Sequence, residues 1–300
     1  DFKSLYPSLI AEFDICLSTV RWQAHADDLG RGQKPPATLR SALKRAADDS
    51  AASRWDPRES RLDADKFTVV PSIPSYPAGS VGDAASLPHA PSGILPRIMD
   101  ALMARRQDCR ARAASCADEA AKERLDSEQR ALKVLANSVF GSLGSRWTRF
   151  SAVPVAALVT SQGRKVLRLS KRIAEEQVAP IFPGVRVIYG DTDSLMVATG
   201  RATLEEAREV ADAVCEQVNA HFARGRICLA ADRFFSRLLL ISKKQYAGLE
   251  VVASAPKGAG SSASGSHDRC VMRRHVGVFL VRRDWSDLAR RTGRQVLDAI

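Results

Sequence analysis

The sequence lacks the patterns that mark zinc sites, disulfide frameworks and membrane spans. None of its six cysteines belongs to a CxxC pair, and its five histidines show no metal spacing. Neither a zinc centre nor a disulfide framework is therefore predicted, and a reducing compartment is favoured. The longest uncharged apolar runs are far below the ~20 residues that span a bilayer, which predicts no membrane partner. No targeting signal is visible, and because the sequence opens at Asp1 within an apolar pattern, we expect it to be a fragment.

Acidic residues are scarcer than basic ones. The 300 residues include 45 Lys and Arg but 34 Asp and Glu, so the formal net charge is +11. Basic side chains that neutralise phosphates release condensed counterions, and this balance therefore favours a polyanionic partner such as nucleic acid. With 45% hydrophobic residues, the chain can bury a sizeable core and is predicted to be globular.

Sustained periodicity is missing from the segment that precedes residue 92. Its composition shifts to Ala, Asp, Arg, Gly, Pro and Ser, and the string PSIPSYPAGS is dense in turn formers. We expect residues 26–91 to form an insertion or a long loop that is partly disordered.

Helical patterns dominate the middle of the chain. One pattern begins after Pro96 and a second runs through Glu128 to Val139, which predicts an antiparallel helical hairpin. A third helix is expected from about Pro154 to Glu176. A fourth begins at Thr203, where the string TLEE is a capping box.

Strand patterns surround an acidic turn. The string VRVIYGDTDSLMVAT predicts a hairpin that carries Asp191 and Asp193 at its tip, and RLLLISKKQYAGLEVV and HVGVFLVRR read as further strands. The predicted fold class is therefore α+β, with helices packed on a mostly antiparallel sheet.

Asp1 and Asp193 are far apart in the sequence and can act together only if folding brings them together. Their mutual repulsion would then demand a cation. Mg²⁺ takes oxygen ligands and is commonly held by one or two carboxylates together with substrate phosphates. Two such ions activate the attacking oxygen and stabilise the leaving oxygen of an in-line displacement. The carboxylates therefore point to chemistry on a nucleoside triphosphate.

Five strings, in this order, resemble the family B DNA polymerases. DFKSLYPSLI, KVLANSVFGSLG and YGDTDS resemble motifs A, B and C of that family. LPRIMDALMARRQDCR, before motif B, resembles its basic fingers helix, and KKQY resembles its KKRY-type string. The resemblance implies a palm formed by residues 1–25 and 146–300 and a helical-hairpin fingers subdomain at 92–145. A thumb would follow the palm, and an exonuclease domain would precede Asp1.

The resemblance also implies the reaction and the metal site. The palm would transfer a deoxynucleoside monophosphate from a dNTP to a primer 3′-OH during genome replication. Asp1 and Asp193 would be catalytic and hold two Mg²⁺ ions, with Mn²⁺ as an alternative, and the Phe2 carbonyl would be a further ligand. Asp191 would serve the catalytic site as an outer-sphere or structural carboxylate. The alternative is that Asp191 and Asp193 are turn residues of a surface hairpin.

Motif A and motif B would bind the nucleotide. The N–H groups of Ser4, Leu5 and Tyr6 would meet the triphosphate, as turn amides commonly do. The Tyr6 ring would lie beneath the sugar and exclude a 2′-OH, unless it is an ordinary core aromatic. Lys133 and Asn137 share a helix face, and the motif places both at the triphosphate.

The fingers helix would supply arginines. Counted from Pro96, the spacing of the family places them at Arg106 and Arg110. The adjacent register would instead choose Arg105 and put Cys109 where a base is expected, and a solvated basic face is the ordinary interpretation of such a helix.

Aromatic and basic residues would contact the DNA. Phe140 replaces the tyrosine usual in the family, and with Gly141 it would pack beneath the nascent base pair, unless it only packs the helix. Lys243, Lys244 and Tyr246 would hold the primer-template DNA, a positioning role that is independent of base sequence. The alternative is an ordinary surface lysine pair on a strand.

The resemblance also predicts the branch of the family, the location of the protein and its partners. LSTV and the fingers string favour a herpesvirus-like or other large DNA virus branch, with a cellular replicative, delta-like branch as the alternative. The location would be the nucleus, the host nucleus if the protein is viral, and a processivity factor would bind through further regions. A catalytically inactive, polymerase-like DNA-binding scaffold is the rival function. Reverse transcriptases usually carry adjacent aspartates, whereas Thr192 separates Asp191 from Asp193.

Overall fold

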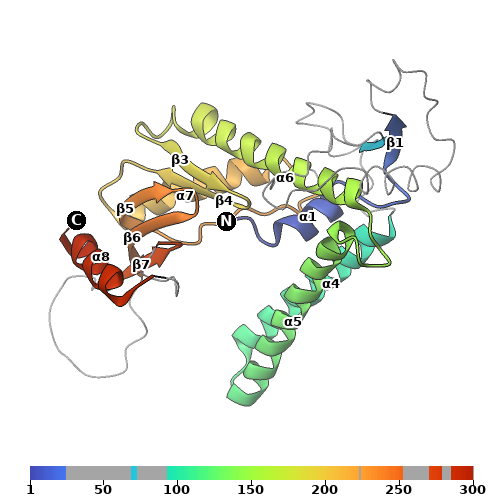
Figure 1. The fold of residues 1–300 in the computed structure, drawn as a ribbon, viewed down its shortest axis with the longest axis horizontal. Helices are drawn as coiled ribbons and strands as arrows, with labels where there is room; N and C mark the ends of the chain where they lie inside the picture. Colours follow the sequence, from blue (N-terminus) through green and yellow to red (C-terminus); the bar gives the residue numbers. More distant parts are fainter. Residues whose placement is uncertain (25–68, 73–92, 223, 253–269, 279–284, 300) are drawn as a thin grey trace.

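The computed structural model describes residues 1–24, 69–72, 93–222, 224–252, 270–278 and 285–299 (Figure 1). Helices pack with small antiparallel sheets in these residues, which confirms the predicted α+β class. The predicted insertion at 26–91 lies outside the described residues, apart from strand β2 (Val69–Ser72), which pairs with β1 (Arg21–Ala24). The domain boundaries proposed from the sequence stay predictions.

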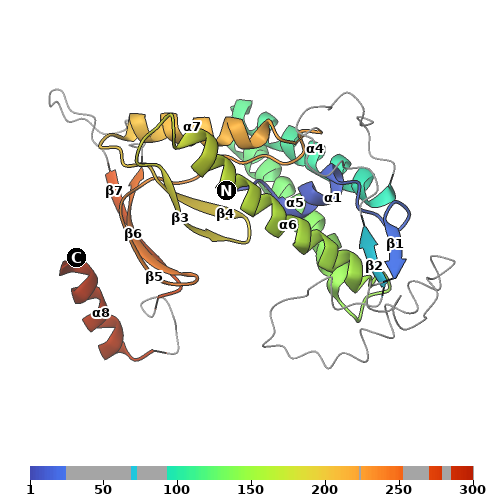
Figure 2. The ribbon, with the colours of Figure 1, turned by 90° about the horizontal axis from the view of Figure 1, so that it is seen from above.

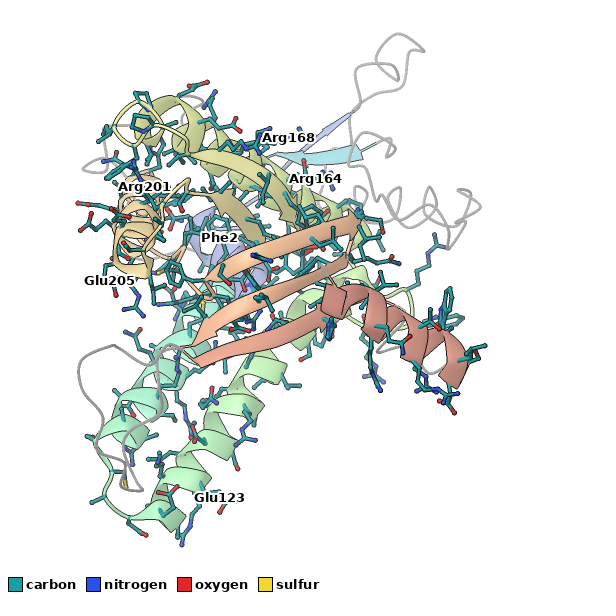
Figure 3. All side chains as sticks on the ribbon, turned by 90° about the vertical axis from the view of Figure 1, so that its left-hand side faces the viewer. Phe2, Glu123, Arg164, Arg168, Arg201 and Glu205 are labelled. Atoms are coloured by element: carbon teal, nitrogen blue, oxygen red, sulfur yellow. The ribbon has the colours of Figure 1, made fainter. Side chains whose placement is uncertain are left out.

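The predicted helical hairpin is formed by α4 (Ile94–Ser115) and α5 (Glu119–Gly144). Asp118 caps α5 by accepting a hydrogen bond from the Ala120 N–H. Small and apolar side chains are buried along the hairpin, among them Cys109, Ala113 and Leu132. The hairpin projects from the rest of the molecule (Figure 1), and Glu123 lies near its far end (Figure 3).

The core lies around α1 (Leu5–Glu12) and α6 (Val153–Ile173). Helix α1 is apolar around most of its circumference, so it is buried on nearly all sides. Helix α6 buries its first two turns completely and continues as one π-helical turn, η3 (Ala174–Val178). Met99 of α4 is fully buried in the same cluster, which joins the base of the hairpin to the core.

The acidic hairpin predicted from the sequence is present. Strands β3 (Arg186–Asp191) and β4 (Ser194–Ala198) pair antiparallel, and Thr192 in the turn has a positive φ of 53°. Helix α7 (Leu204–Asn219) follows, and its predicted capping box forms between Thr203 and Glu206.

The third sheet contains β5 (Phe235–Ser242), β6 (Gln245–Val252) and β7 (Cys270–Val276), all antiparallel. Figure 2 shows this sheet beside the β3–β4 hairpin, with α8 (Asp287–Ala299) apart from it.

Two strand predictions in this region were wrong. The sequence predicted one strand through Lys243 and Lys244, but both residues lie in the turn between β5 and β6. Lys244 has a φ of 62°, a conformation that its residue type does not signal. Strand β7 ends at Val276, before Gly277 with its φ of 64°, so the strand predicted over HVGVFLVRR is interrupted at Gly277. Residues 279–283 of that string lie outside the described residues. Among the described residues, no helix is long and apolar enough to cross a membrane.

Candidate active site

Three distant segments meet at the first residues of the chain. The Phe2 N–H donates to the Asp193 carbonyl at 2.8 Å, and the Lys3 N–H donates to the Cys228 carbonyl at 2.9 Å. Asp1 and Ala230 exchange two backbone hydrogen bonds of 2.8 and 3.0 Å. Phe2 is buried near the centre of the molecule (Figure 3). The fold therefore brings Asp1 next to the tip of the acidic hairpin.

A cavity of about 490 Å³ opens at this junction. Its walls come from the first six residues of the chain, the helices α4 and α5 that were predicted to form the fingers, the acidic turn and the segment before β5. It brings together all of the predicted metal and nucleotide residues: Asp1, Phe2, Ser4, Leu5, Tyr6, Arg106, Arg110, Lys133, Asn137 and Asp193. The remaining lining residues are Lys3, Thr192, Ala230, Ala231 and Asp232.

A slightly larger cavity, of about 540 Å³, lies between β4, α7 and β5. It shares Asp1 and the Ala230–Asp232 segment with the first cavity, but aliphatic side chains of α7 and β4 form much of its wall. None of the fingers residues reaches it. The smaller cavity is therefore the candidate active site.

Acidic and basic groups both line the candidate active site, and most of the basic groups come from α4 and α5. Asp1, Asp193 and Asp232 supply carboxylates, whereas the fingers supply Arg106 and Lys133 with their neighbours. Asp232 was not predicted from the sequence, because no motif string includes it. Oxygen ligands of this kind fit Mg²⁺ or Mn²⁺. In the part of the chain that the structure describes, no three metal-binding side chains are clustered. Ions held here would thus need substrate oxygens as further ligands.

Asp191 does not line this cavity. Its carboxylate forms an ion pair of 2.6 Å with the Lys244 ammonium, which raises the pKa of Lys244. The Lys244 backbone N–H also donates to the Tyr189 hydroxyl at 2.9 Å. Asp191 thus ties the acidic hairpin to the β5–β6 turn, an arrangement that fits a structural role.

Ser4 and Tyr6 shape the motif A side of the cavity. Ser4 has left-handed backbone angles and precedes α1, so the first N–H groups of that helix have no carbonyl partner within the helix. N–H groups in this position attract anions. The Tyr6 ring stacks on Phe140, with centroids 4.2 Å apart. Burial, and then Asp193, raise the pKa of Tyr6, so its hydroxyl stays neutral.

The two fingers arginines at 105 and 106 point to different places. The Arg106 guanidinium donates to the Ser4 hydroxyl at 2.9 Å and to Gln129 at 3.3 Å. Arg105 donates twice to Glu128 within the hairpin, at 2.7 and 3.0 Å. Burial, and then Arg110, lower the pKa of Arg106. The cavity wall therefore presents adjacent positive charges that an anion would neutralise.

The remaining predicted residues lie outside this cavity. Gly141 faces open space on α5. Lys243 is exposed in the β5–β6 turn, and Tyr246 packs edge-on against Phe235 with centroids 6.2 Å apart. The fold places Lys244 next to Asp191 but does not bring Lys243 or Tyr246 to the nucleotide residues.

Known proteins resemble this chain over its whole length. The family model described as DNA polymerase family B matches residues 1–300. The DNA polymerase alpha catalytic subunit of Mus musculus is 32% identical over 309 residues, covering 100% of this chain and 16% of the relative. The subunit of Dictyostelium discoideum is 30% identical, and the match covers 100% of this chain and 16% of the relative. The subunit of Trypanosoma brucei brucei is 32% identical, and the match covers 100% of this chain and 18% of the relative. The chain thus spans less than a fifth of these relatives.

Proposed function

The chain belongs to DNA polymerase family B, and from this we propose that the protein synthesises DNA on a template by adding dNTPs to a primer 3′-OH. The observation that carries the proposal is the single cavity lined by motif A, motif C and both fingers helices. Carboxylates together with guanidinium and ammonium groups in one cavity suit a metal-bound triphosphate.

The proposed mechanism divides the work between palm and fingers. Asp1 and Asp193 would hold two Mg²⁺ ions, with the Phe2 carbonyl as a further ligand. When bound, these ions would lower the pKa of the primer 3′-OH and stabilise the leaving pyrophosphate. The fingers residues that line the cavity would bind the triphosphate oxygens and offset the negative charge that grows in the transition state.

The aromatic pair would position the base and the sugar. Tyr6 lines the nucleotide cavity, and Phe140, which does not line it, stacks on the Tyr6 ring. Tyr6 would contact the sugar, and Phe140 with Gly141 would face the nascent base pair. Lys243, Lys244 and Tyr246 lie outside the nucleotide cavity and would hold the primer-template duplex.

The relatives described above bear on the branch of the family. All three are cellular DNA polymerase alpha catalytic subunits, so we place the chain with the cellular replicative branch and the protein in the nucleus. The viral branch favoured by the sequence strings gains no support from these relatives. A processivity factor stays a prediction for regions beyond this chain.

Extension of a primed DNA template by the full-length protein tests the proposed function. We expect extension with Mg²⁺ and none after chelation with EDTA, restored by added Mg²⁺ or Mn²⁺. DNA binding without extension under any of these conditions would favour the inactive scaffold instead.

Arg106→Ala should lower kcat/KM for dNTP by about 30-fold, because a charge-assisted hydrogen bond to a phosphate contributes roughly 2 kcal/mol. Arg105→Ala is the matched control, since Arg105 binds Glu128 within the hairpin. It should change kcat/KM by less than about twofold, as expected for an exposed ion pair. A larger loss in Arg105→Ala than in Arg106→Ala would show that the adjacent register is the functional one, and equal losses would contradict a specific role for Arg106. Single-nucleotide incorporation at varied dNTP concentration measures both.

A further inference from the structure

A buried carboxylate organises the segment that leads into the active-site floor. Glu12, at the end of α1, is fully buried and accepts backbone hydrogen bonds from Arg224 at 3.0 Å and Arg226 at 2.8 Å. The Arg224 guanidinium in turn donates to the Glu12 carbonyl at 2.8 Å, at the negative end of the α1 dipole. Residues 224–226 are therefore held firmly against α1.

Arg226 extends this arrangement to the fingers. Its Nε and Nη2 donate to the two carboxylate oxygens of Asp100 on α4, at 2.8 and 3.0 Å, while its Nη1 donates to the Arg224 carbonyl at 2.8 Å. Such a two-bond guanidinium–carboxylate pair fixes orientation as well as distance. Both side chains are partly buried, so solvent weakens the pair less than it weakens an exposed one.

The same segment continues directly to the carboxylates of the active site. Cys228 and Ala230 bond to Lys3 and Asp1. Leu229 lies between these two residues in the chain. The Asn219 side chain of α7 donates a hydrogen bond to the Leu229 carbonyl at 3.0 Å and accepts one from the Leu229 N–H at 2.7 Å. The backbone of residues 226–230, with hydrogen bonds at both of its ends, thus connects Asp100 on α4 with Asp1.

Asp100 lies near the start of the long helix α4, so a small rotation there moves the rest of the helix by a larger distance. Arg106 and Arg110 follow it on the same helix, about 9 and 15 Å further along the helix axis. Figure 1 shows α4 lying beside α1 at the base of the hairpin and extending away from it. A rotation of about 5° at Asp100 would therefore move Arg110 by roughly 1 Å. A displacement of about 1 Å would stretch a guanidinium–phosphate hydrogen bond beyond its usual length of about 2.9 Å, so dNTP binding should weaken.

We infer that the Asp100–Arg226 ion pair is a positioning latch, which sets the fingers arginines at the correct distance from the palm carboxylates for dNTP binding. The inference rests on the proposed function, because it assigns the pair to the same nucleotide site. Neither Asp100 nor Arg226 lines the cavity, so the pair acts through Arg106 and Arg110.

A double-mutant cycle tests the latch in the full-length protein. Asp100→Ala, Arg226→Ala and the double variant should each raise KM for dNTP by about tenfold, with kcat changed less than about twofold. The double variant should be no worse than the single ones, because all three break the same pair. KM for primer-template DNA should stay at the wild-type value. Glu128→Ala is the matched control: it breaks the comparable Arg105–Glu128 pair, which stays within the hairpin, and should leave KM for dNTP unchanged.

Several other results would contradict the latch inference. A fall in kcat at constant KM, with a lower free energy of unfolding, would mean that the pair only stabilises the fold. Additive effects in the double variant would mean that Asp100 and Arg226 do not act as a pair. An equal rise in KM in Glu128→Ala would mean that the effect is not specific to this pair. If the wild-type protein extends a primer and the variants have the wild-type KM for dNTP, the latch inference is wrong and the proposed function stands. Wild-type protein that does not extend a primer defeats the proposed function and the latch together.

Discussion

Asp193→Ala is expected to lower the rate of nucleotide incorporation by at least about 1,000-fold, which corresponds to about 4 kcal/mol of transition-state stabilisation. Asp193 lines the same cavity as Arg106, Arg110 and Lys133, and its backbone carbonyl accepts a hydrogen bond from the Phe2 N–H, so Asp193 lies next to motif A. A carboxylate that holds metal ions cannot be replaced by a methyl group without loss of the charge that binds them. The side chain is exposed, so the variant should fold and bind primer-template DNA with the wild-type Kd.

Asp191→Ala is the matched control for this result. Its carboxylate belongs to the same turn but forms an ion pair with Lys244 and does not reach the cavity. We expect a loss of less than about tenfold, the effect of one partly exposed ion pair. Rapid-quench incorporation of a single dNTP, together with DNA binding by fluorescence anisotropy, measures both variants. Parallel loss of DNA binding and incorporation in Asp193→Ala would argue against a metal role for that residue.

Tyr6→Ala should let the protein incorporate ribonucleotides, reducing its discrimination against them by about 100-fold. The ring is held in place by its stack on Phe140 and by α6, where Gly163 leaves room for the side chains of α1. A rigid ring cannot move away from a 2′-OH, and overlap of this kind costs about 3 kcal/mol in a well-packed site. Removing the ring removes the overlap, so kcat/KM for ribonucleotides should rise relative to that for dNTPs.

Tyr6→Phe separates the ring from the hydroxyl. It keeps the stacked face and should keep the discrimination within about threefold of the wild type, because the hydroxyl is neutral and is not required for the overlap. Competition between a ribonucleotide and its deoxy counterpart on the same template gives the ratio directly. Unchanged discrimination in Tyr6→Ala would remove Tyr6 from the sugar-selecting role and leave it as a core aromatic.

Much of the architecture could be predicted because its signals are local. The capping box at Thr203 and the β-branched runs around the acidic turn depend on neighbours within a few residues, and the structure contains both elements. The strand predicted through Lys243 and Lys244 was wrong because that prediction also relied on local signals. Their turn has no glycine, proline or asparagine to mark it, and tertiary packing imposes the positive φ of Lys244.

The functional residues show the same division between local signals and tertiary contacts. Motif strings nominated the residues that line the cavity. They favoured Arg106 over Arg105 only through the spacing from Pro96, because the two arginines differ in the helix faces that packing assigns to them. Asp232 had no string to mark it and is brought to the cavity by the bonds between Ala230 and Asp1.

The sequence by itself determined the residue types, the order of the motifs and the α+β class, because composition and short-range periodicity carry that information. Only the tertiary structure decided which arginine meets Ser4, which aspartate pairs with Lys244 and where Asp100 finds Arg226. These contacts join residues that lie far apart along the chain. Their distances depend on how whole helices and sheets pack, and no local pattern encodes them.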